Sequence, residues 1–575
     1  MSKLNIDQKS IFALFNDKKS DFLIPDYQRP YAWTEAECQT LWDDIFTFAI
    51  PNDDYSQFNS NDEYFLGPIV VFKNEDKKLE VIDGQQRLTT LMLLLRAFYS
   101  KFGNMQDDNS KRTRERIEQC LWKTDEFDKP NRNELKISSD VATDNDKSEF
   151  LEILKTGVVC KNYKSKYAEN YQFFETKIHD FLSRYPSFFP YLPTRILTNC
   201  ILLPIEAESQ DTALRIFSTL NDRGKALSDS DIFKAQFYKF YSLRGEKDEF
   251  IKRWKILEDR CEKIFHPLTG TPMDDLFTRY MYYERAKQGI KDTTTAALRK
   301  FYEKEGYVLL KKEETFENLI KLSKFWEDVS NQSQDKFSDR ILKKLFILEY
   351  APNSMWTYFV SVYFMKNADN DGNLDERLFF EFLSTIIGFI WAYSIIRPGV
   401  NALRAPVYSE MINIVNGREI SFSDYKFDKD ELRTQITNFK FYNGRPVTKS
   451  MLAWWMFNFG EQRVVSIESV FEIEHIYAKN RPFSGDKERL ELLGNKSMLE
   501  KRVNIRASDY RFSDKIKWYN GYQNNRGQIK EGTNVFELRK LAQEKTDFIG
   551  SDIEDRNFEI INSFIEYIGS INLTK

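Results

Sequence analysis

The sequence predicts a multidomain α+β protein: an α/β domain at the N-terminus, a largely α-helical middle, and a small ββα domain set within helices near the C-terminus. Three observations predict this class. A chain of 575 residues is too long for one hydrophobic core. Short β-like runs precede an apolar helix in the first hundred residues, and two strand-like runs precede a basic helical run after residue 470. We therefore expect domains at 1–238, 239–430 and 431–575.

Composition narrows the class of protein. With 41% hydrophobic residues the chain can bury substantial cores, and its net charge of −4 argues against a uniformly basic nucleic-acid binder. The five cysteines include no C-x-x-C pair, which excludes a zinc ribbon and favours a reducing, cytoplasmic setting. The longest apolar run, Phe382–Ile396, is shorter than the ~20 residues that cross a bilayer, so we expect a buried helix and no membrane.

The N-terminal domain is expected to combine two separated parts of the chain. Strands at Phe65–Phe72 and Leu79–Ile82 precede a helix from about Gln85 to Tyr99, which is apolar almost all round and should be buried. A helical insertion then occupies about 100–195. The strand-like run Ile201–Ala207 returns the chain to the first domain.

Polar composition and capping signals place the loops and the next helix. Residues 123–147 have loop composition, and residues 211–224 read as an amphipathic helix followed by a turn. Ser228 and Asp231 then form a capping-box pattern that starts a helix. In the helical middle, 367–373 resembles the start of a calcium loop but lacks the glutamate at the twelfth position, so we expect an ordinary polar loop.

One of only three histidines, His475, directly follows an acid and precedes two asparagines. Hydrolysis of a phosphodiester needs a base for water and a metal for the charge on the leaving oxygen. A neutral histidine suits the first role, and oxygen ligands suit Mg²⁺. We expect His475 to be the general base, and Glu474 and Asn504 to bind Mg²⁺ or Mn²⁺ in a ββα-metal (HNH) arrangement. Asn495 would order the loop and the histidine. Strict strand alternation would send Glu474 and His475 to opposite faces, so the strand must end or twist at this pair.

A local excess of basic residues surrounds this constellation. The residues expected to contact DNA are Lys496, Lys501, Arg502, Arg506 and Arg511. The structural alternative is that His475 closes a β-edge and the asparagines cap turns. The acid, both asparagines, the strand–strand–helix order and the basic helix together favour the nuclease site.

A second pattern, DGQQR at Asp83–Arg87, places a glycine turn and two amides before an arginine at the start of a helix. Free N–H groups at a helix N-terminus favour phosphate, and an arginine adds bidentate contacts. Upstream, Gln28 and Arg29 form another Gln-Arg pair among aromatic residues and prolines. From the residues alone, phosphate binding and a simple pairing of Arg87 with a carboxylate are equally supported. The absence of a G-x-x-x-x-G-K-[ST] loop excludes a P-loop NTPase.

Several long motifs resemble those of one family. IPDYQRPYAW, YFLGPIVV, VIDGQQRLTTLMLLL and IFSTLNDRGKALSDSDIFKA resemble the N-terminal domain of GmrSD-type modification-dependent (type IV) restriction endonucleases. EIEHI, LGNKSMLEKRVNIRAS and the pair Phe512/Lys515 resemble that family's C-terminal HNH domain. The sequence departs from the family pattern where Tyr477 and Ala478 replace a proline after the histidine, and where Lys496 replaces a leucine.

The resemblance implies a ParB/sulfiredoxin-like NTP-binding fold at the N-terminus and adds Lys515 to the catalytic residues of the HNH domain. The implied nucleotide site comprises Asp83, Gly84, Gln85, Gln86 and Arg87, completed or supported by Gln28, Arg29, Asn221, Gly224 and Asp231. Members of this family act on invading DNA, commonly modified phage DNA, and couple NTP hydrolysis to nicking or cleavage.

We therefore expect a cytoplasmic, NTP-dependent anti-phage DNA endonuclease with a sensor domain, a helical connector and an HNH effector. Its expected ligands are an NTP, Mg²⁺ or Mn²⁺, and DNA. Two alternatives stay open: an NTP-dependent DNA-binding switch with a degenerate nuclease site, and an abortive-infection nuclease that acts on host DNA or RNA. Whether the protein forms a homodimer is also open.

Overall fold

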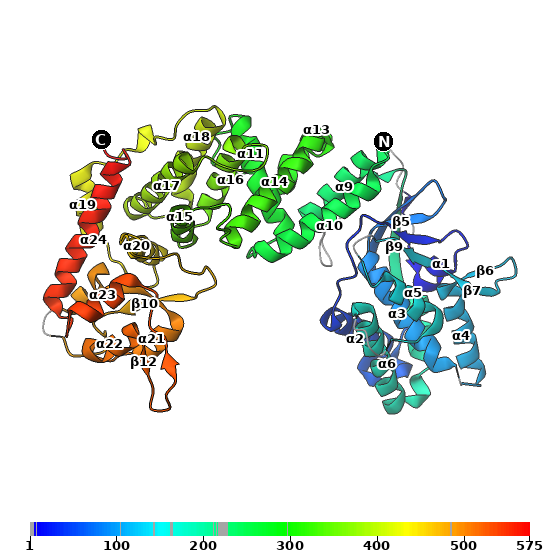
Figure 1. Ribbon diagram of the computed structural model, residues 1–575. Coiled ribbons are helices and arrows are strands. Elements are labelled where there is room, and N and C mark those ends of the chain that lie inside the picture. The colour runs from blue at the N-terminus through cyan, green and yellow to red at the C-terminus, as the bar shows by residue number, and fades with distance from the viewer. Residues whose placement is uncertain are drawn as a thin grey trace. The chain divides into compact units, whose positions relative to one another are not determined.

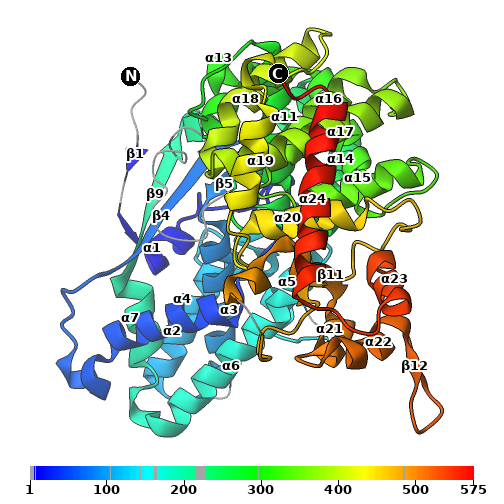
Figure 2. The ribbon, with the colours of Figure 1, turned by 90° about the vertical axis from the view of Figure 1, so that its left-hand side faces the viewer.

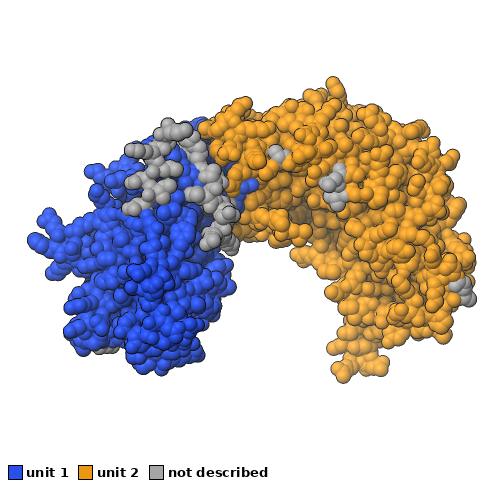
Figure 3. Space-filling model, turned by 180° about the vertical axis from the view of Figure 1, so that it is seen from behind, with its two compact units in different colours: residues 1–255 blue, residues 256–575 orange. Residues whose placement is uncertain are grey.

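The computed structural model describes residues 5–6, 8–103, 105–141, 144–160, 165–210, 212–213, 216, 228–295, 297–483 and 486–575. They form two compact units, Met1–Lys255 (unit 1) and Ile256–Lys575 (unit 2) (Figure 3). Unit 1 is mixed α/β, and unit 2 is helical with short strands near its C-terminal end. The multidomain α+β class is therefore as predicted, whereas the three-domain division stays a prediction.

A seven-stranded mixed sheet forms the centre of unit 1 (Figure 1). Its strands are β1 (Asn5–Ile6), β2 (Lys9–Ser10), β3 (Phe22–Ile24), β4 (Tyr64–Lys73), β5 (Leu79–Asp83), β8 (Ile137–Ser139) and β9 (Cys200–Ala207). The order across the sheet is β1-β9-β4-β5-β3-β8, and β2 also pairs with β9. β4 runs parallel to β9 and antiparallel to β5. The pairing of β4 with β9 confirms that the chain returns to the first domain after the insertion.

Helix α3 (Gln85–Phe102) is the buried helix of unit 1 and follows β5 after a single glycine. Its apolar residues from Leu88 to Phe98 are fully buried, and it packs against α4 (Asp108–Leu121) and α6 (Lys166–Arg184). Each large aliphatic side chain removed from water contributes about 1.5–3 kcal/mol. The all-round apolar pattern thus predicted both the helix and its burial. The helix begins directly after the C-terminal end of β5.

The segment expected to be a helical insertion is joined to the main sheet. Besides α4 and α6 it contains α5 (Lys147–Thr156) and α7 (Tyr191–Asn199). It also contains strands, where the composition of residues 123–147 predicted a loop: β6 (Trp122–Thr124), β7 (Pro130–Leu135) and β8. β6 and β7 pair as a hairpin, and β8 extends the sheet beside β3. Ile137, only 1% exposed, anchors β8 although its neighbours are polar.

The remaining helices of unit 1 lie at its two ends in sequence: α1 (Ile11–Asn16), α2 (Glu35–Ala49), α9 (Asp229–Leu243) and α10 (Lys247–Ile264), the last of which continues into unit 2. The predicted capping box begins α9: the Asp231 N–H donates to Ser228 Oγ (3.1 Å) and the Ser228 N–H donates to an Asp231 carboxylate oxygen (3.0 Å). Both reciprocal bonds satisfy N–H groups that the helix leaves free. The helix and turn predicted at 211–224 lie outside the described residues, apart from 212, 213 and 216.

Unit 2 is built mainly of helices, among them the long apolar helix α17 (Glu376–Ile396). Others are α11 (Pro272–Lys287), α12 (Leu298–Tyr302), α13 (Lys304–Tyr307), α14 (Glu313–Ser330), α15 (Asp339–Glu349), α16 (Met355–Asn367), α18 (Arg404–Val415), α19 (Lys429–Asn438), α20 (Pro446–Met456) and α24 (Gly550–Ser570). The C-terminal helix α24 packs back against α17 and α19 (Figure 2). Among the described helices, α17 alone is long and apolar enough to cross a membrane, yet 72% of its most apolar window is buried inside the protein. A core helix was predicted for this run.

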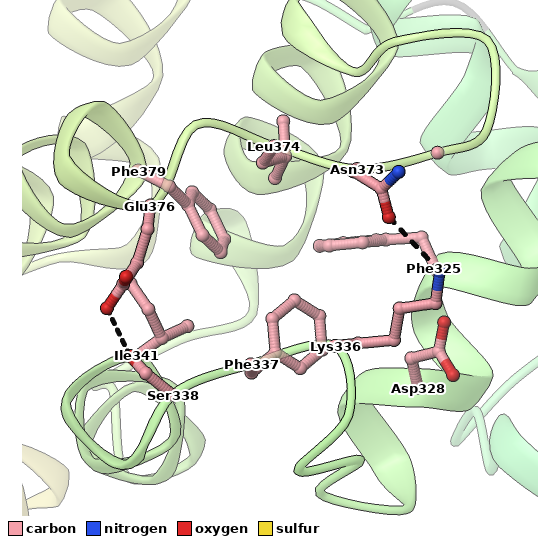
Figure 4. Close-up of a pocket in the computed structure, with 11 residues that line it drawn as sticks. Phe325, Asp328, Lys336, Phe337, Ser338, Ile341, Asn373, Leu374, Glu376 and Phe379 are labelled. Atoms are coloured by element: carbon pink, nitrogen blue, oxygen red, sulfur yellow. Dashed lines mark hydrogen bonds between the residues drawn. The ribbon is translucent and has the colours of Figure 1, made fainter.

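The calcium-like motif at 367–373 is an ordinary polar turn. Asp369 accepts the N–H groups of Asp371 (3.0 Å) and Asn373 (2.8 Å), and Gly372 supplies the left-handed conformation at φ 80°. The Asn373 side chain accepts a bond from Lys336 Nζ (3.1 Å), beside a small hollow lined by Phe325, Phe337 and Phe379 (Figure 4). Its polar groups are engaged within the protein, as the sequence predicted.

Lys344 on α15 is a half-buried cation that should reduce the stability of unit 2, although its Nζ donates to the Tyr567 hydroxyl at 3.4 Å. Its Nζ lies 5.2 Å from the ring centroid of Phe380 and 5.0 Å from that of Tyr567, and burial lowers its pKa to about 8. The unfolded chain, with the ordinary lysine pKa of about 10.5, binds the proton more tightly between these values. Lys344 therefore lowers the free energy of unfolding fully below pH 8, and this penalty disappears as the pH rises to 10.5.

We expect Lys344→Met to raise the free energy of unfolding at pH 7, because it removes a desolvated charge and keeps an apolar chain of similar length. The gain should shrink as the pH is raised from 8 towards 10.5. Urea unfolding at pH 7 and pH 10 measures this difference, with Lys343→Met on the same helix as control. A gain that is constant with pH would show that desolvation of the ammonium is not its cause.

Candidate functional site

The predicted strand–strand–helix order is present in unit 2. β10 (Phe471–His475) pairs antiparallel with β11 (Lys496–Glu500), and α21 (Lys501–Ala507) follows β11 without a loop. In this register His475 lies opposite Lys496, and Glu474 lies opposite Ser497. Residues directly opposite each other share a face of the hairpin, and consecutive residues alternate between faces. The hairpin therefore carries Glu472 and Glu474 on one face and His475 with Lys496 on the other.

Glu474 is buried in a bonded pair with helix α22 (Phe512–Asn520). Its carboxylate, 4% exposed, accepts bonds from Lys515 Nζ and from the Tyr519 hydroxyl, both at 2.7 Å. Burial raises the pKa of Glu474, and the Lys515 ammonium partly offsets that rise. Lys515 also donates to the main-chain carbonyl of His475 (2.7 Å). Lys515 and Glu474 thus fix the end of β10 from the side that faces α22.

His475 lies in a different environment. Its Nε2 is buried and has no hydrogen-bond partner among the described residues. Burial lowers the pKa of His475 to about 4, and the Lys496 ammonium on the same face adds to this effect. A buried polar atom without a partner is uncommon and points to a function or to an absent partner. The imidazole is therefore neutral at neutral pH and has a nitrogen available to accept a proton.

Asn495 fastens the chain that follows His475. It is fully buried, its Oδ1 accepts the Tyr477 N–H (2.7 Å), and its Nδ2 donates to the Tyr477 carbonyl (3.1 Å). Its own carbonyl accepts the N–H of Ile476 (2.9 Å). One amide side chain thus satisfies both main-chain groups of Tyr477. This is the loop-ordering geometry that the sequence led us to expect of Asn495.

The turn that carries Asn495 is clamped by Arg556 of α24. Arg556 Nη1 donates to the carbonyls of Leu493 (3.0 Å), Gly494 (2.9 Å) and Lys496 (2.8 Å). Its Nε and Nη2 make a two-pronged ion pair with Glu537 of α23 (Phe536–Glu544), at 2.6 and 2.8 Å. A Cβ on Gly494 would lie 1.9 Å from the carbonyl oxygen of Ile553, so only glycine permits this contact between turn and helix. The position of Asn495 is therefore set by a helix some sixty residues further along the chain.

Asn504 on α21 contacts Glu472 rather than Glu474. Its Nδ2 donates to Glu472 Oε2 at 2.8 Å, and Lys501 Nζ lies 3.8 Å from the other carboxylate oxygen. The Glu472 side chain is 38% exposed, so its carboxylate is within reach of solvent. Sequence reasoning missed Glu472, although the alternation of FEIEH places it on the same face as Glu474. The structure therefore does not bring Glu474, His475 and Asn504 onto one shared face.

The oxygen donors near α21 suit a hard divalent cation, and they include one carboxylate, that of Glu472, which the sequence did not single out. One exposed carboxylate with one amide, completed by water, is the donor set that Mg²⁺ accepts. Glu472 and Asn504 provide it, whereas the Glu474 carboxylate is already paired with Lys515. No group of three or more His, Cys, Asp or Glu side chains is placed to hold a metal ion in the part of the chain that the structure describes. The metal-binding roles of Glu474 and Asn504 stay predictions.

The predicted basic surface is mostly present. Lys501, Arg502 and Arg511 are exposed and Arg506 is partly exposed, while Arg502 pairs with Glu531 at 3.0 Å. Lys496 requires a correction. Its ammonium is fully buried and donates to Glu491 and to the carbonyl of Phe441, both at 2.6 Å. Because no part of its side chain reaches solvent, Lys496 does not belong to an exposed DNA-binding face in this structure.

In unit 1, the Asp83–Arg87 motif forms the turn from β5 into α3. Gly84 precedes the helix at φ 89°, and a Cβ there would lie 2.6 Å from Ile69 of β4, so glycine is required. Burial raises the pKa of Asp83, an effect partly offset by the Gly84 N–H and by Arg87 and Arg29. Arg87 Nη1 donates to the Pro68 carbonyl (2.8 Å), and burial lowers the pKa of its guanidinium. The Asp83 carboxylate and the Arg87 guanidinium therefore lie close together, largely shielded from solvent, at the start of α3.

The three glutamines of the predicted nucleotide site hold its two motifs together. Gln28 Nε2 donates to the carbonyls of Val81 (3.2 Å) and Ile82 (3.0 Å). Gln85 Nε2 donates to the Arg29 carbonyl (3.3 Å). Gln86 accepts the Ala32 N–H (2.7 Å) and donates to the Pro30 carbonyl (3.2 Å). These hydrogen bonds bring Arg29 beside Asp83 and Arg87. The three glutamines therefore help to fix the structure of the site.

The structure leaves part of the predicted nucleotide site undescribed. Asn221 and Gly224 lie outside the described residues. The Asp231 carboxylate caps α9, which gives it a structural use of its own. Asp83, Gly84, Arg87 and Arg29 are the predicted residues that the structure gathers at one place, and nucleotide binding by them stays a prediction.

Comparison with known proteins finds a match for an N-terminal part of this chain. Residues 11–238 match a family model described as the GmrSD restriction endonuclease, N-terminal domain. The match covers the strands β3, β4, β5, β8 and β9 of the sheet, helix α3 and the first part of the capped helix α9. No curated protein matches the chain.

Proposed function

We propose, from the membership of residues 11–238 in the GmrSD restriction endonuclease family, that this protein is an NTP-dependent endonuclease that cuts DNA at an HNH site in unit 2. The family supports endonuclease activity and DNA as a partner. One observation carries the HNH assignment: a strand–strand–helix segment holds a neutral histidine whose buried Nε2 has no hydrogen-bond partner among the described residues. Modified phage DNA is the proposed target.

In this proposal His475 Nε2 takes the proton of the attacking water. The lowered pKa keeps the imidazole neutral, and therefore basic, throughout the neutral range. Because Nε2 is buried, DNA must displace the residues that cover it. Glu472 and Asn504, which lie on the face of β10 opposite to His475, would hold Mg²⁺ or Mn²⁺, and the ion when bound would stabilise charge on the leaving oxygen. The proposal therefore requires the end of β10 to twist so that the metal and His475 reach the same phosphate. Asn495 and Lys515 act by positioning, since they hold the chain on either side of His475.

In unit 1, Arg87, Arg29 and the start of α3 would bind the phosphates of an NTP. A helix N-terminus offers unpaired N–H groups, and the buried guanidinium of Arg87 adds charge where little water screens it. The acid Asp83 beside Arg87 is available to hold the cation of a metal–nucleotide complex or to keep Arg87 oriented when no nucleotide is bound. NTP occupancy would then regulate cleavage by unit 2.

Arg87→Ala should reduce NTP turnover at least tenfold, because it removes the buried guanidinium from the proposed phosphate site. Colorimetric release of phosphate from each of the four NTPs measures the effect, and circular dichroism checks that unit 1 remains folded. Arg112→Ala, at an exposed position of α4, is the matched control. Turnover equal to that of the parent protein would assign Arg87 to the alternative structural pairing with Asp83.

The function is tested by incubating the protein with supercoiled plasmid, unmodified phage DNA and modified phage DNA, with each NTP and with Mg²⁺ or Mn²⁺. The proposal expects nicked or linear product only with a divalent cation, and more product with NTP. RNA and host chromosomal DNA, added as further substrates, distinguish the abortive-infection alternative. Absence of product under every condition would overturn the nuclease assignment.

One observation favours a second candidate, an NTP-dependent DNA-binding switch whose nuclease site has decayed. Glu474 is neutralised by Lys515 and lies on the face of β10 opposite to His475. A site without convergent acid and base would bind DNA and not cut it. This candidate predicts NTP-dependent DNA binding in a gel-shift assay together with no product in the cleavage assay.

A further inference from the structure

A two-stranded hairpin projects from unit 2 beside the candidate nuclease site. It consists of β12 (Tyr522–Gln523) and β13 (Ile529–Lys530), joined by five residues (Figures 1 and 2). From Tyr522 to Lys530 the hairpin contains two basic residues, Arg526 and Lys530, and no acid. The Ile529 side chain is 79% exposed, and Asn525, Arg526 and Gln528 are exposed as well. None of these hairpin residues was singled out from the sequence. Because their side chains are exposed, they are not needed for packing within the protein.

The tip of the hairpin is ordered by its own hydrogen bonds. Asn524 Oδ1 accepts the N–H groups of Arg526 (3.0 Å) and Gln528 (2.9 Å), and Asn524 Nδ2 donates to Gln528 Oε1 (3.0 Å). Gly527 at φ 73° donates its N–H to the Asn524 carbonyl (2.9 Å). The turn residues Asn525 and Arg526 are therefore presented at a defined point, where binding costs less conformational entropy than in a loose loop.

The base of the hairpin is fixed to the end of α22. Gly521 and Gly532 cross there so closely that a Cβ on Gly532 would lie 2.3 Å from the Tyr519 carbonyl oxygen. Thr533 donates its N–H to that same carbonyl (3.0 Å). Tyr519 also donates its hydroxyl to Glu474 at the end of β10. The hairpin is thus tied, through one residue, to the strand that carries His475.

We propose that this hairpin is a recognition ribbon that enters a groove of duplex DNA and reads base edges next to the cleavage site. This inference rests on the proposed function, since it assigns DNA to the same unit. A two-stranded ribbon fits the major groove, where arginine reads guanine, amide side chains read adenine, and an apolar group contacts the thymine methyl. Arg526, Asn525 and Ile529 supply these three kinds of group, and Lys530 and Lys517 supply charge for the phosphates.

The proposal predicts two different effects from two substitutions in the hairpin. Arg526→Ala should weaken binding to the preferred duplex about tenfold and relax preference at one base pair, with a small change in salt dependence. Lys530→Ala should weaken binding to all duplexes alike and lower the salt slope by about one ion. Neither residue is part of the catalytic machinery, so both variants should keep the folding transition of the parent protein.

The test uses the full chain in a His475→Ala background, so that binding is measured without cleavage. Selection from a randomised duplex pool, followed by fluorescence anisotropy at two salt concentrations, gives preference and affinity. Arg539→Ala, exposed on α23 of the same unit, is the matched control. The inference is overturned if the Arg526→Ala and Arg539→Ala variants bind with equal affinity and preference, or if the His475→Ala protein binds no duplex at all.

Failure of the nuclease proposal has a different signature. In that case the protein with His475 intact leaves DNA uncut, while the hairpin variants still change duplex affinity and preference as predicted. If instead cleavage is observed and the Arg526→Ala variant binds and cuts like the parent, the hairpin inference fails and the nuclease proposal stands.

Discussion

Substitution of His475 by alanine should lower DNA cleavage by about 10²- to 10⁴-fold, the usual contribution of a positioned general base. The reason is that the His475 imidazole is neutral at pH 7 and that its buried Nε2 has no hydrogen-bond partner among the described residues, so the ring can accept the proton of water. Because Nε2 makes no hydrogen bond within the described structure, its loss removes none of the bonds that hold β10 in place. NTP turnover, which is proposed for unit 1, should be unchanged.

The measurement is the rate of nicking of supercoiled plasmid or phage DNA with a divalent cation and NTP, beside NTP turnover of the same preparation. His179→Ala is the control, because His179 is exposed on α6 of unit 1. A His475→Ala protein that cuts at the parental rate would place the general base elsewhere. A parent protein that binds DNA without cutting it would favour the switch alternative.

The second large effect is expected at Arg556, whose guanidinium makes five bonds inside unit 2. Arg556→Ala should lower the free energy of unfolding of unit 2 by about 3–5 kcal/mol, because it leaves the Glu537 carboxylate buried without its cation. It also frees the carbonyls of Leu493, Gly494 and Lys496, which hold the turn that carries Asn495. Cleavage should therefore fall together with stability.

Urea unfolding followed by tryptophan fluorescence measures this effect, since Trp455 donates to Glu537 and will report the change. Glu559→Ala, at an exposed position of the same helix, is the matched control and should stay within about 0.5 kcal/mol of the parent. NTP turnover is proposed for unit 1, so the Arg556→Ala variant should keep it at temperatures where unit 2 remains folded. A loss below 1 kcal/mol would mean that the clamp is replaced by water or by another cation.

Local structure around both candidate sites was predictable because its signals are local. The apolar run after Gly84 predicted α3, and the Ser228–Asp231 pattern predicted the start of α9. The two strand-like runs expected after residue 470 are present as β10 and β11. Periodicity and capping depend on side chains a few positions apart, so a single sequence contains them.

The side-chain partners at the same sites were not predictable. Lys496 has the composition of a surface cation beside other basic residues, but it is buried, and Glu491 and the Phe441 carbonyl accept hydrogen bonds from its ammonium. Glu472 was overlooked, although it is the carboxylate that meets Asn504. The strand β8 was missed because one buried isoleucine in a polar stretch carries no periodic signal.

The sequence by itself determined the elements that carry the two candidate sites, the glycines that their turns require, and the set of residues at each site that are chemically suited to it. Only the tertiary structure decided which face each residue occupies and which charges are already paired. The physical reason is that alternation along β10 separates Glu474 from His475 by purely local geometry, while the element that covers each face comes from elsewhere in the chain. Helix α22, some forty residues away, takes Glu474 into an ion pair, and the covering of the opposite face leaves His475 neutral and unpartnered.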